Sequence, residues 1–321
     1  MPSPERKLIQ AIRRIGATSR NSTVIKGIGD DTAVLRLRRG HEFLVTTDLC
    51  VEGFHFRRKW HPADFVGYRC LARGLSDIAA MGGEPIACFL SLGLPEDLDQ
   101  KWVTNFARGL TGLARRFGVE LAGGDTSGAP TITADIVVIG QTPQGKVILR
   151  SGAKPGDRIF VTGELGESAA TLQGLFVGKK IRPSKQNRHF YPEPRIAVGR
   201  WLRRRGIATA MIDLSDGLSV DLSHICDESR VAAVINERQI PTARKASLSL
   251  ALDGGEDYEL LFTASRRSKV PKAIEGVRVT EIGTIRGRSY NRPQMQILGQ
   301  NGALKPLKPL GWQHFSGGKQ G

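Results

Sequence analysis

Long apolar segments are missing from this chain of 321 residues. No apolar run approaches the roughly 18 residues that a membrane-spanning helix needs. Residues 1–16 interleave basic side chains with leucine and isoleucine, which is the spacing of an amphipathic helix and not of a signal peptide. We therefore expect a cytoplasmic protein with no membrane partner.

Cysteine and aromatic residues are also scarce. The four cysteines are Cys50, Cys70, Cys88 and Cys226, and no two of them have the CxxC spacing of metal and redox sites. Cysteines scattered in this way are typical of small buried hydrophobic residues in a reducing compartment. Aromatic residues make up only 6% of the chain, and no RNA-binding or zinc-finger pattern accompanies its basic residues.

The charge is unbalanced, with 47 Lys and Arg against 31 Asp and Glu, or +16 formally. Such an excess attracts anions, and nucleic acid is one possible anionic partner. The basic clusters at 57–59 and 203–205 are short, however, so we do not expect nucleic acid to be the main partner.

Several familiar nucleotide-binding and catalytic motifs are absent. The chain has no GxxxxGK[ST] phosphate loop, no kinase-type catalytic loop, no GxSxG elbow and no HExxH helix. The segment GIGDDT at 27–32 begins like a dinucleotide fingerprint but lacks its third glycine. Its two adjacent carboxylates would repel a pyrophosphate unless a cation lay between them.

In place of these motifs, the chain has several aspartates next to Gly, Ser or Thr. They occur in GDD at 29–31, TTD at 46–48, SD at 76–77, GGDT at 123–126 and DLSDG at 213–217. Most follow a short apolar run, which predicts carboxylates on tight turns at the ends of buried strands. Carboxylates that converge in one cleft repel each other unless cations separate them, and hard oxygen ligands suit Mg²⁺. The pattern therefore predicts a site with several metal ions that handles phosphates.

The predicted elements alternate between strands and helices in both halves of the chain. In the first half we expect strands at 44–47, 86–94, 119–122 and 131–140, and helices at 65–81 and 99–117. In the second half we expect strands at 158–162, 208–212 and 259–264, and helices at 193–206 and 219–229. This order predicts an α/β protein of two domains, residues 1–145 and 146–321, the second ending in a short basic tail.

Seven segments together resemble one known family. They are GIGDDTAV at 27–34, TTD at 46–48 with GFHF at 53–56, LSDIAAMG at 75–82, GGDT at 123–126, RSGAKPGD at 150–157, IDLSDGL at 212–218 and GEDYEL at 255–260. In this order and spacing they resemble the thiamine-monophosphate kinase family, within the superfamily of aminoimidazole ribonucleotide synthetase and selenophosphate synthetase. The resemblance covers residues 27–312. It implies two α/β (α+β) lobes of the synthetase type, and a homodimer in which the N-terminal lobes pair their sheets.

The resemblance also implies a reaction and a set of site residues. ATP would phosphorylate thiamine phosphate to thiamine diphosphate, with several Mg²⁺ ions. The metal ligands that carry over are Asp30, Thr46, Thr47, Asp48, Asp77, Asp125, Asp213 and Asp216. The ATP contacts are Gly124, Asp125, Arg150 and Ser215, and the thiamine phosphate contacts are His55, Glu256 and Trp312. The residues closest to the chemistry are Arg150, Asp125, Asp213 and Asp216.

Two alternatives stay open at this point. One is another ATP-using enzyme of the same superfamily. Selenophosphate synthetases have a reactive cysteine in an N-terminal glycine-rich segment, whereas the first cysteine here is Cys50. The other is a basic nucleic-acid-binding protein that has kept the fold. Such a protein is expected to lose metal ligands, whereas the six predicted aspartate ligands are all present, which favours the kinase.

Overall fold

The computed structural model describes residues 11–12, 14–15, 23–26, 34–36, 38–289 and 291–312. The predicted ligand Asp30, its neighbour Asp31 and the expected basic tail at 316–321 lie outside the described residues. The chain forms two compact units, Met1–Val147 with Pro183–Gln186, and Ile148–Arg182 with Asn187–Gly321. Within the part of the chain that is described, no helix is long and apolar enough to cross a membrane.

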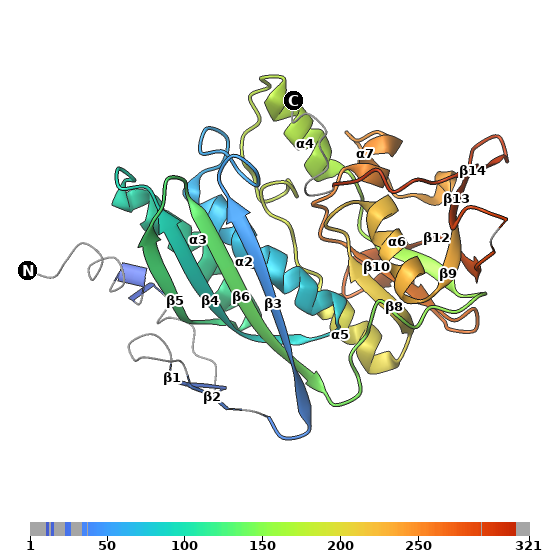
Figure 1. The fold of residues 1–321 in the computed structure, drawn as a ribbon, viewed down its shortest axis with the longest axis horizontal. Coiled ribbons are helices and arrows are strands. Elements are labelled where there is room, and N and C mark those ends of the chain that lie inside the picture. Colours follow the sequence, from blue (N-terminus) through green and yellow to red (C-terminus); the bar gives the residue numbers. More distant parts are fainter. Residues whose placement is uncertain are drawn as a thin grey trace, which may run out of the picture. The chain divides into compact units, whose positions relative to one another are not determined.

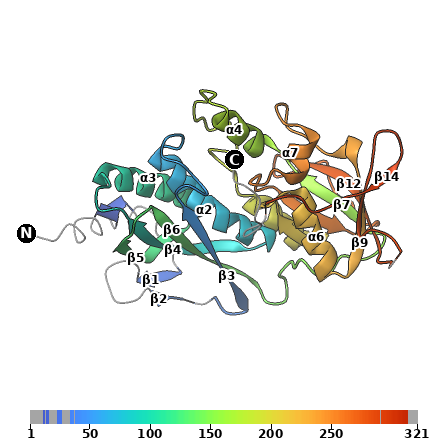
Figure 2. The same ribbon diagram turned by 45° about the horizontal axis from the view of Figure 1, so that its top comes forward.

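The first unit is a four-stranded sheet with two helices on one face (Figure 1). The strand order is β3 (His41–Val51), β6 (Thr133–Pro143), β4 (Glu84–Leu94) and β5 (Glu120–Gly128). β6 pairs antiparallel with both β3 and β4, whereas β5 runs parallel to β4. Figure 2 shows α2 (Ala63–Ala80) and α3 (Gln100–Phe117) together over this sheet.

Glycines let α2 and α3 approach each other closely. A Cβ atom added at Gly67 of α2 would lie 1.9 Å from the carbonyl oxygen of Phe106, and one at Gly109 of α3 would lie 1.8 Å from that of Asp64. Both distances are far below van der Waals contact, so only glycine fits at either position. Gly67 and Gly109 therefore allow the close packing of these two helices.

The two faces of the sheet differ in burial. Along β6, buried residues alternate with half-buried ones, as expected for a strand that faces the helices with every second side chain. On the other face, Val24 of β1 (Val24–Lys26) and Leu35 of β2 (Val34–Leu35) pack against Ile86, Ala87 and Ala122. On β3, this face leaves Phe43, Val45 and Leu49 exposed, at 43%, 66% and 53%.

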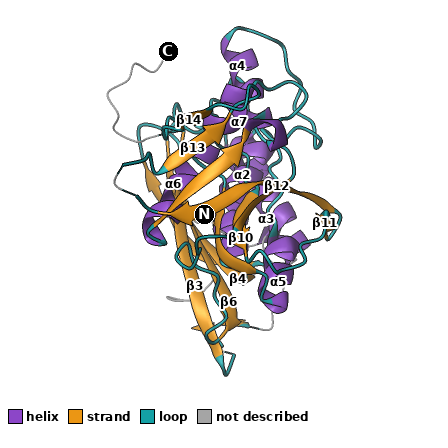
Figure 3. Cartoon of the chain, turned by 90° about the vertical axis from the view of Figure 1, so that its right-hand side faces the viewer, coloured by secondary structure: helices purple, strands orange, loops and turns teal. Residues whose placement is uncertain are grey.

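The second unit is built on a larger, mostly antiparallel sheet, whose strands are orange in Figure 3. The strand order is β14 (Leu304–Pro306), β13 (Met295–Leu298), β9 (Val231–Asn236), β12 (Val277–Gly287), β7 (Arg158–Thr162), β10 (Leu260–Ala264) and β8 (Ala208–Asp213), with β11 (Ala273–Ile274) paired to β12. The helices are α4 (Glu167–Phe176), α5 (Ile196–Arg205), α6 (Leu218–Glu228) and α7 (Leu248–Asp253), with a short 3-10 helix, η1 (Glu237–Gln239). The mixed α/β class expected from the sequence is confirmed in both units.

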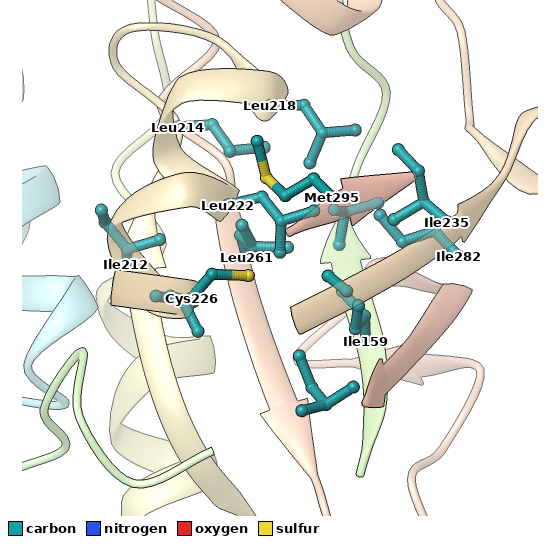
Figure 4. Packing of buried hydrophobic residues seen from close by; sticks show 14 of the residues in the cluster. Ile159, Ile212, Leu214, Leu218, Leu222, Cys226, Ile235, Leu261, Ile282 and Met295 are labelled. Carbon is teal, nitrogen blue, oxygen red and sulfur yellow. The ribbon is translucent and has the colours of Figure 1, made fainter. Parts of the chain in front are cut away.

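Helix α6 and the sheet enclose the core of the second unit. Leu222 and Cys226 of α6 pack with Leu261 of β10 and Met295 of β13 in one buried cluster (Figure 4). All four cysteines of the chain are buried and free, as predicted. Burial raises the pKa of the Cys88 and Cys226 thiols to about 12, so both are uncharged at neutral pH and act as small hydrophobic residues.

Candidate active site

In the second unit, two loops hold each other by backbone hydrogen bonds where β8 and β10 meet. Asp213 is the last residue of β8 and pairs with Leu260 at the start of β10. The pairing continues beyond the strands, because Leu214 N donates to Glu259 O at 2.8 Å and Tyr258 N donates to Leu214 O at 2.9 Å. Glu256 N then donates to Ser215 O at 2.7 Å, which places Glu256 beside Ser215.

The loop that carries Glu256 has an unusual backbone. Gly255, Glu256 and Tyr258 all have positive φ, at 67°, 57° and 51°. A left-handed conformation at a residue other than glycine costs on the order of 1–3 kcal/mol, and such strain gathers at functional sites. Asp257 helps to hold the loop, because both of its carboxylate oxygens accept a hydrogen bond from Gly166 N, the residue before α4, at 2.9 Å. The loop is thereby fixed with Glu256 at the Ser215 turn.

The end of the described chain reaches the same turn. Trp312 N donates to Asp216 O at 2.9 Å, and the Trp312 side chain stays 47% exposed. The preceding Gly311 lies so close that an added Cβ atom would be 2.2 Å from Asp216 O. Five residues predicted from the sequence are therefore brought together in this unit: Asp213, Ser215, Asp216, Glu256 and Trp312.

Asp221 joins this group, although the sequence did not single it out. Its buried carboxylate accepts hydrogen bonds from Asp216 N at 3.2 Å and Gly217 N at 3.1 Å. Burial, followed by the charges of Asp213 and Asp216, raises the pKa of Asp221 well above its usual range. Donor atoms of Asp216, Asp221 and His224 lie within 4.8 Å of one another. The sequence signal that could have identified Asp221 is its position five residues after Asp216, in the first turn of α6.

In the first unit, β3 and α2 bring a second group of predicted residues together. The Thr46 hydroxyl donates a short hydrogen bond to the Asp77 carboxylate of α2. Asp48, two residues along the same face of β3, pairs with Arg73 of α2 at 3.3 Å. Burial raises the pKa of Asp48 to about 6, and the charge of Asp77 adds to the effect while Arg73 opposes it.

Thr47 points to the opposite face of the sheet. Its hydroxyl donates to the Asp135 carboxylate of β6 at 2.8 Å. Asp135 also helps to raise the pKa of Asp48, after the larger effects of burial and Asp77. Sequence reasoning missed Asp135, although a carboxylate in the middle of the apolar strand at 131–140 is a visible signal.

Gly124 and Asp125 lie on β5, beside a small cavity. Gly124 has φ 154°, and an added Cβ atom would lie 1.9 Å from the carbonyl oxygen of Leu90 on β4, so glycine is required there. The cavity has a volume of about 90 Å³, and its lining residues are Ile12, Leu90, Leu92, Leu121, Gly123, Gly124, Asp125 and Thr126. Two of the four predicted ATP contacts, Gly124 and Asp125, are thus neighbours on the wall of a partly apolar cavity.

The structure corrects one expectation about these aspartates. Thr46, Thr47 and Asp48 lie inside β3, Asp77 lies inside α2 and Asp125 lies inside β5, not on turns. The strands continue because β3 pairs with β6 along its whole length and β5 pairs with β4 as far as Gly128. Among the predicted aspartates that the structure describes, only the Asp213–Asp216 segment has the expected position, at a strand end.

Comparisons with known proteins show which family the chain belongs to. The sequence matches the family described as AIR synthase related protein, with its N-terminal domain at residues 29–142 and its C-terminal domain at 154–295. Thiamine-monophosphate kinase of Bacillus subtilis (strain 168) is 35% identical over 317 residues, which are 93% of this chain and 96% of that protein. The chain belongs to the thiamine-monophosphate kinase family. The resemblance and the two-lobed α/β fold expected from the sequence are therefore confirmed.

Solved structures of this family share the fold. Thiamine-monophosphate kinase from Stenotrophomonas maltophilia K279a superposes with a TM-score of 0.80 at 32% identity, over 92% of this chain and 97% of that one. The structure described as AaThiL complexed with AMPPCP and TMP has a TM-score of 0.77 at 32% identity, over 97% of both chains.

Two further residues that the family resemblance selects are His55 and Arg150. His55 follows β3, and its Nδ1 accepts a hydrogen bond from Val51 N at 3.0 Å. In the neutral ring the proton is then on Nε2, the nitrogen that would donate to a substrate. Arg150 has an exposed side chain, and its backbone oxygen accepts from the Ser229 hydroxyl at 2.9 Å.

Both groups have donor sets that fit Mg²⁺. In the first unit, Asp48 is partly buried near Asp77, and burial together with the charge of Asp77 raises its pKa, while Arg73 opposes both effects. In the second unit, Asp213 and Asp216 disfavour the charge of Asp221. Carboxylates crowded in this way favour a hard divalent cation, since its charge offsets their repulsion and its preferred ligands are oxygens.

Proposed function

We propose that this protein catalyses the ATP-dependent phosphorylation of thiamine phosphate to thiamine diphosphate. One observation carries the proposal. The hydrogen bonds from Glu256 N to Ser215 O and from Trp312 N to Asp216 O join two predicted substrate contacts to the turn that carries predicted ATP and metal contacts. The relative described as a complex with AMPPCP and TMP supports the same pair of substrates.

The reaction needs charge neutralisation more than proton transfer. A phosphate oxygen of thiamine phosphate attacks the γ-phosphorus of ATP in line, and ADP leaves. A phosphomonoester has its second pKa near 6, so the attacking oxygen is largely deprotonated at neutral pH and no general base is required. A site rich in aspartate suits this reaction, because catalysis rests on positioning and electrostatic stabilisation.

The predicted substrate contacts suit a cationic, aromatic molecule. The Glu256 carboxylate offsets the positive charge of the thiazolium ring. The half-exposed Trp312 ring offers a face on which that cation stacks, which is worth roughly 1–2 kcal/mol when the pair is desolvated. His55 donates from Nε2 to the pyrimidine or the phosphate.

Several Mg²⁺ ions would take part in the proposed reaction. Asp48, Asp77, Asp125, Asp213 and Asp216 would hold them, with oxygens of Thr46 and Thr47 and with Asp30. Bound Mg²⁺ neutralises charge on the phosphoryl group that is transferred. The guanidinium group of Arg150 would add a permanent positive charge near the transferred phosphoryl group.

The direct test is a thiamine diphosphate assay with purified protein. The reaction contains thiamine phosphate, ATP and Mg²⁺, with EDTA added in one control and free thiamine replacing thiamine phosphate in another. We expect metal-dependent product from thiamine phosphate only. A folded protein that binds ATP yet makes no thiamine diphosphate would contradict the proposal and point to another acceptor within the superfamily.

We also propose that the protein is a homodimer in which the sheets of the first unit pair. Phe43, Val45 and Leu49 form a row on the face of β3 away from α2, and all three are more than two-fifths exposed. Neighbouring apolar side chains on an open sheet face are typical of a protein interface. The cytoplasmic location expected from the sequence stays a prediction.

A further inference from the structure

Glu259 lies in the GEDYEL segment at 255–260, but the proposed reaction gives it no role. Its side chain is 3% exposed, and Arg195 binds both of its carboxylate oxygens. Arg195 Nε donates to Oε2 at 2.6 Å, and Nη2 donates to Oε1. The Thr162 hydroxyl also donates to Oε2, at 2.5 Å. Burial and three hydrogen bonds keep this carboxylate from a metal ion or a substrate, so Glu259 acts through the structure around it.

Arg195 occupies a position where a cation does not stabilise the helix that follows. It is the residue directly before α5, and its side chain makes no capping hydrogen bond there. Helix N-termini favour Ser, Thr, Asp or Asn and a negative charge, because the helix dipole is positive at that end. The helix therefore does not explain a buried arginine at this position, whereas the ion pair with Glu259 does.

This ion pair fixes one end of the strained loop described above. Glu259 directly follows Tyr258 and lies three residues after Glu256, and both of those residues have positive φ. The backbone oxygen of Glu259 also accepts the hydrogen bond from Leu214 N. Left-handed residues other than glycine persist only where the surrounding contacts over-determine the backbone. Arg195 supplies such a contact from a distant segment of the chain.

A gain in stability is the simplest alternative explanation of the pair. A buried ion pair is a weak source of stability, because lost hydration offsets most of the attraction, and apolar residues of similar volume often serve as well. Apolar residues do not supply direction, however. A planar guanidinium that faces a carboxylate through two hydrogen bonds has one geometry. Such geometry suits a loop that must hold one side chain in place.

Building on the proposed function, we propose that Arg195 is a positioning residue for thiamine phosphate. Its ion pair with Glu259 holds the loop in the conformation that places Glu256 beside Ser215. Arg195 acts through Glu259 and is not itself a substrate contact. The proposal adds a residue from the segment before α5 to a site whose predicted contacts lie elsewhere in the chain.

The turn that carries predicted ATP and metal contacts has a support of its own. Asp221 accepts hydrogen bonds from Asp216 N and Gly217 N at 3.2 and 3.1 Å, and neither bond involves the loop that carries Glu256. Loss of the ion pair should therefore raise KM for thiamine phosphate more than KM for ATP. A merely structural role would change both values together or leave both unchanged.

The test replaces the ion pair by an uncharged pair of similar shape. The double variant Arg195→Met with Glu259→Gln removes both charges together, and the glutamine oxygen can still accept from the Thr162 hydroxyl. The matched control is the double variant Arg158→Met with Glu281→Gln. Arg158 donates to Glu281 at 3.0 Å in the same sheet, at the opposite end of β7 from Thr162.

Amide hydrogen exchange follows the loop without requiring activity. Glu256 N and Tyr258 N are hydrogen-bonded, so both should exchange slowly in the unchanged protein. We expect the Arg195 and Glu259 double variant to exchange both amides and to raise KM for thiamine phosphate by about tenfold or more, with KM for ATP changed less than about threefold. Arg195→Lys keeps the charge but not the two-bond geometry, so it should give intermediate values. The control double variant should behave as the unchanged protein does.

Unchanged loop exchange and an unchanged KM for thiamine phosphate would overturn the proposal. Equal increases in the two KM values, or an equal effect of the control double variant, would overturn it too. Thermal unfolding shows whether the Arg195 and Glu259 double variant folds, and if it does not, Arg195→Lys decides by the same two measurements. If the unchanged protein makes no thiamine diphosphate, the proposed reaction fails, whereas loop exchange still shows whether Arg195 holds the loop.

Discussion

Asp48 is a carboxyl group whose surroundings disfavour its charge. Its pKa is about 6 in the folded protein against 3.8 ordinarily, which corresponds to about 3 kcal/mol. Because the folded pKa is raised, the ionised group destabilises the metal-free protein above pH 6. This destabilisation decreases as the pH falls from about 6 towards 3.8, because Asp48 is then protonated in the folded protein before it is protonated in the unfolded chain.

We therefore expect Asp48→Asn to stabilise the metal-free protein at pH 8 by about 1–3 kcal/mol, an advantage that disappears near pH 4. The same change should abolish activity, because Asp48 is a predicted metal ligand. Urea unfolding at pH 8, 6 and 4, with EDTA present, measures the first effect. A variant less stable than the unchanged protein at pH 8 would show that the Arg73 pair outweighs desolvation.

Arg150 is the predicted fixed cation at the transferred phosphoryl group. Arg150→Ala should lower kcat about 100-fold or more, because one lost electrostatic contact to a developing charge is worth roughly 3–4 kcal/mol. Lys154, exposed in the same loop, is the matched control, and Lys154→Ala should leave kcat unchanged. Steady-state kinetics measures both, and full turnover by Arg150→Ala would remove it from the catalytic residues.

The α2–α3 pair depends on glycine at the crossing point. Gly67→Ala would place a methyl group 1.9 Å from the Phe106 carbonyl oxygen, so the helices must separate. We expect a loss of about 1–3 kcal/mol in the free energy of unfolding, as for an overpacked core. Because α2 carries Arg73 and Asp77, activity should fall too.

Gly112 of α3 provides the control for this prediction. An added Cβ atom there would meet open space, so Gly112→Ala should stabilise the protein by about 0.5–1 kcal/mol through helix propensity alone. Thermal unfolding of the two variants should therefore shift in opposite directions. Equal shifts would mean that the close helix crossing does not limit stability.

Elements with strong local signals were predictable, and the others were not. Helix α3 was expected at 99–117 and spans Gln100–Phe117, because its apolar stripe and Gly118 are local features. No strand was expected at β9, β12 or β13, whose apolar residues become recognisable as a buried sheet only when the strands pair. The aspartates of β3 and β5 were placed on turns for the same reason, since long-range pairing extends both strands.

At the scale of the whole molecule, the exposed apolar residues Phe43, Val45 and Leu49 of β3 allow a test of the proposed homodimer. Leu49→Lys should convert the expected dimer to a monomer, because it places a charge within an apolar interface. Leu304→Lys is the matched control, with a similarly exposed leucine on β14 of the other unit, at 49% against 53%. Light scattering after size exclusion measures the mass. An unchanged protein that is already monomeric would contradict the dimer.

The sequence alone determined the family, the two-lobed α/β class and the candidate residues, because ordered motifs and periodic apolar spacing are properties of the chain itself. Which residues stand together was decided only by the fold. Asp135 meets Thr47 across two strands, Asp221 reaches back to Asp216, and Arg195 pairs with the buried Glu259. These contacts depend on strand register and burial, which arise only when segments distant in the sequence pack and exclude water.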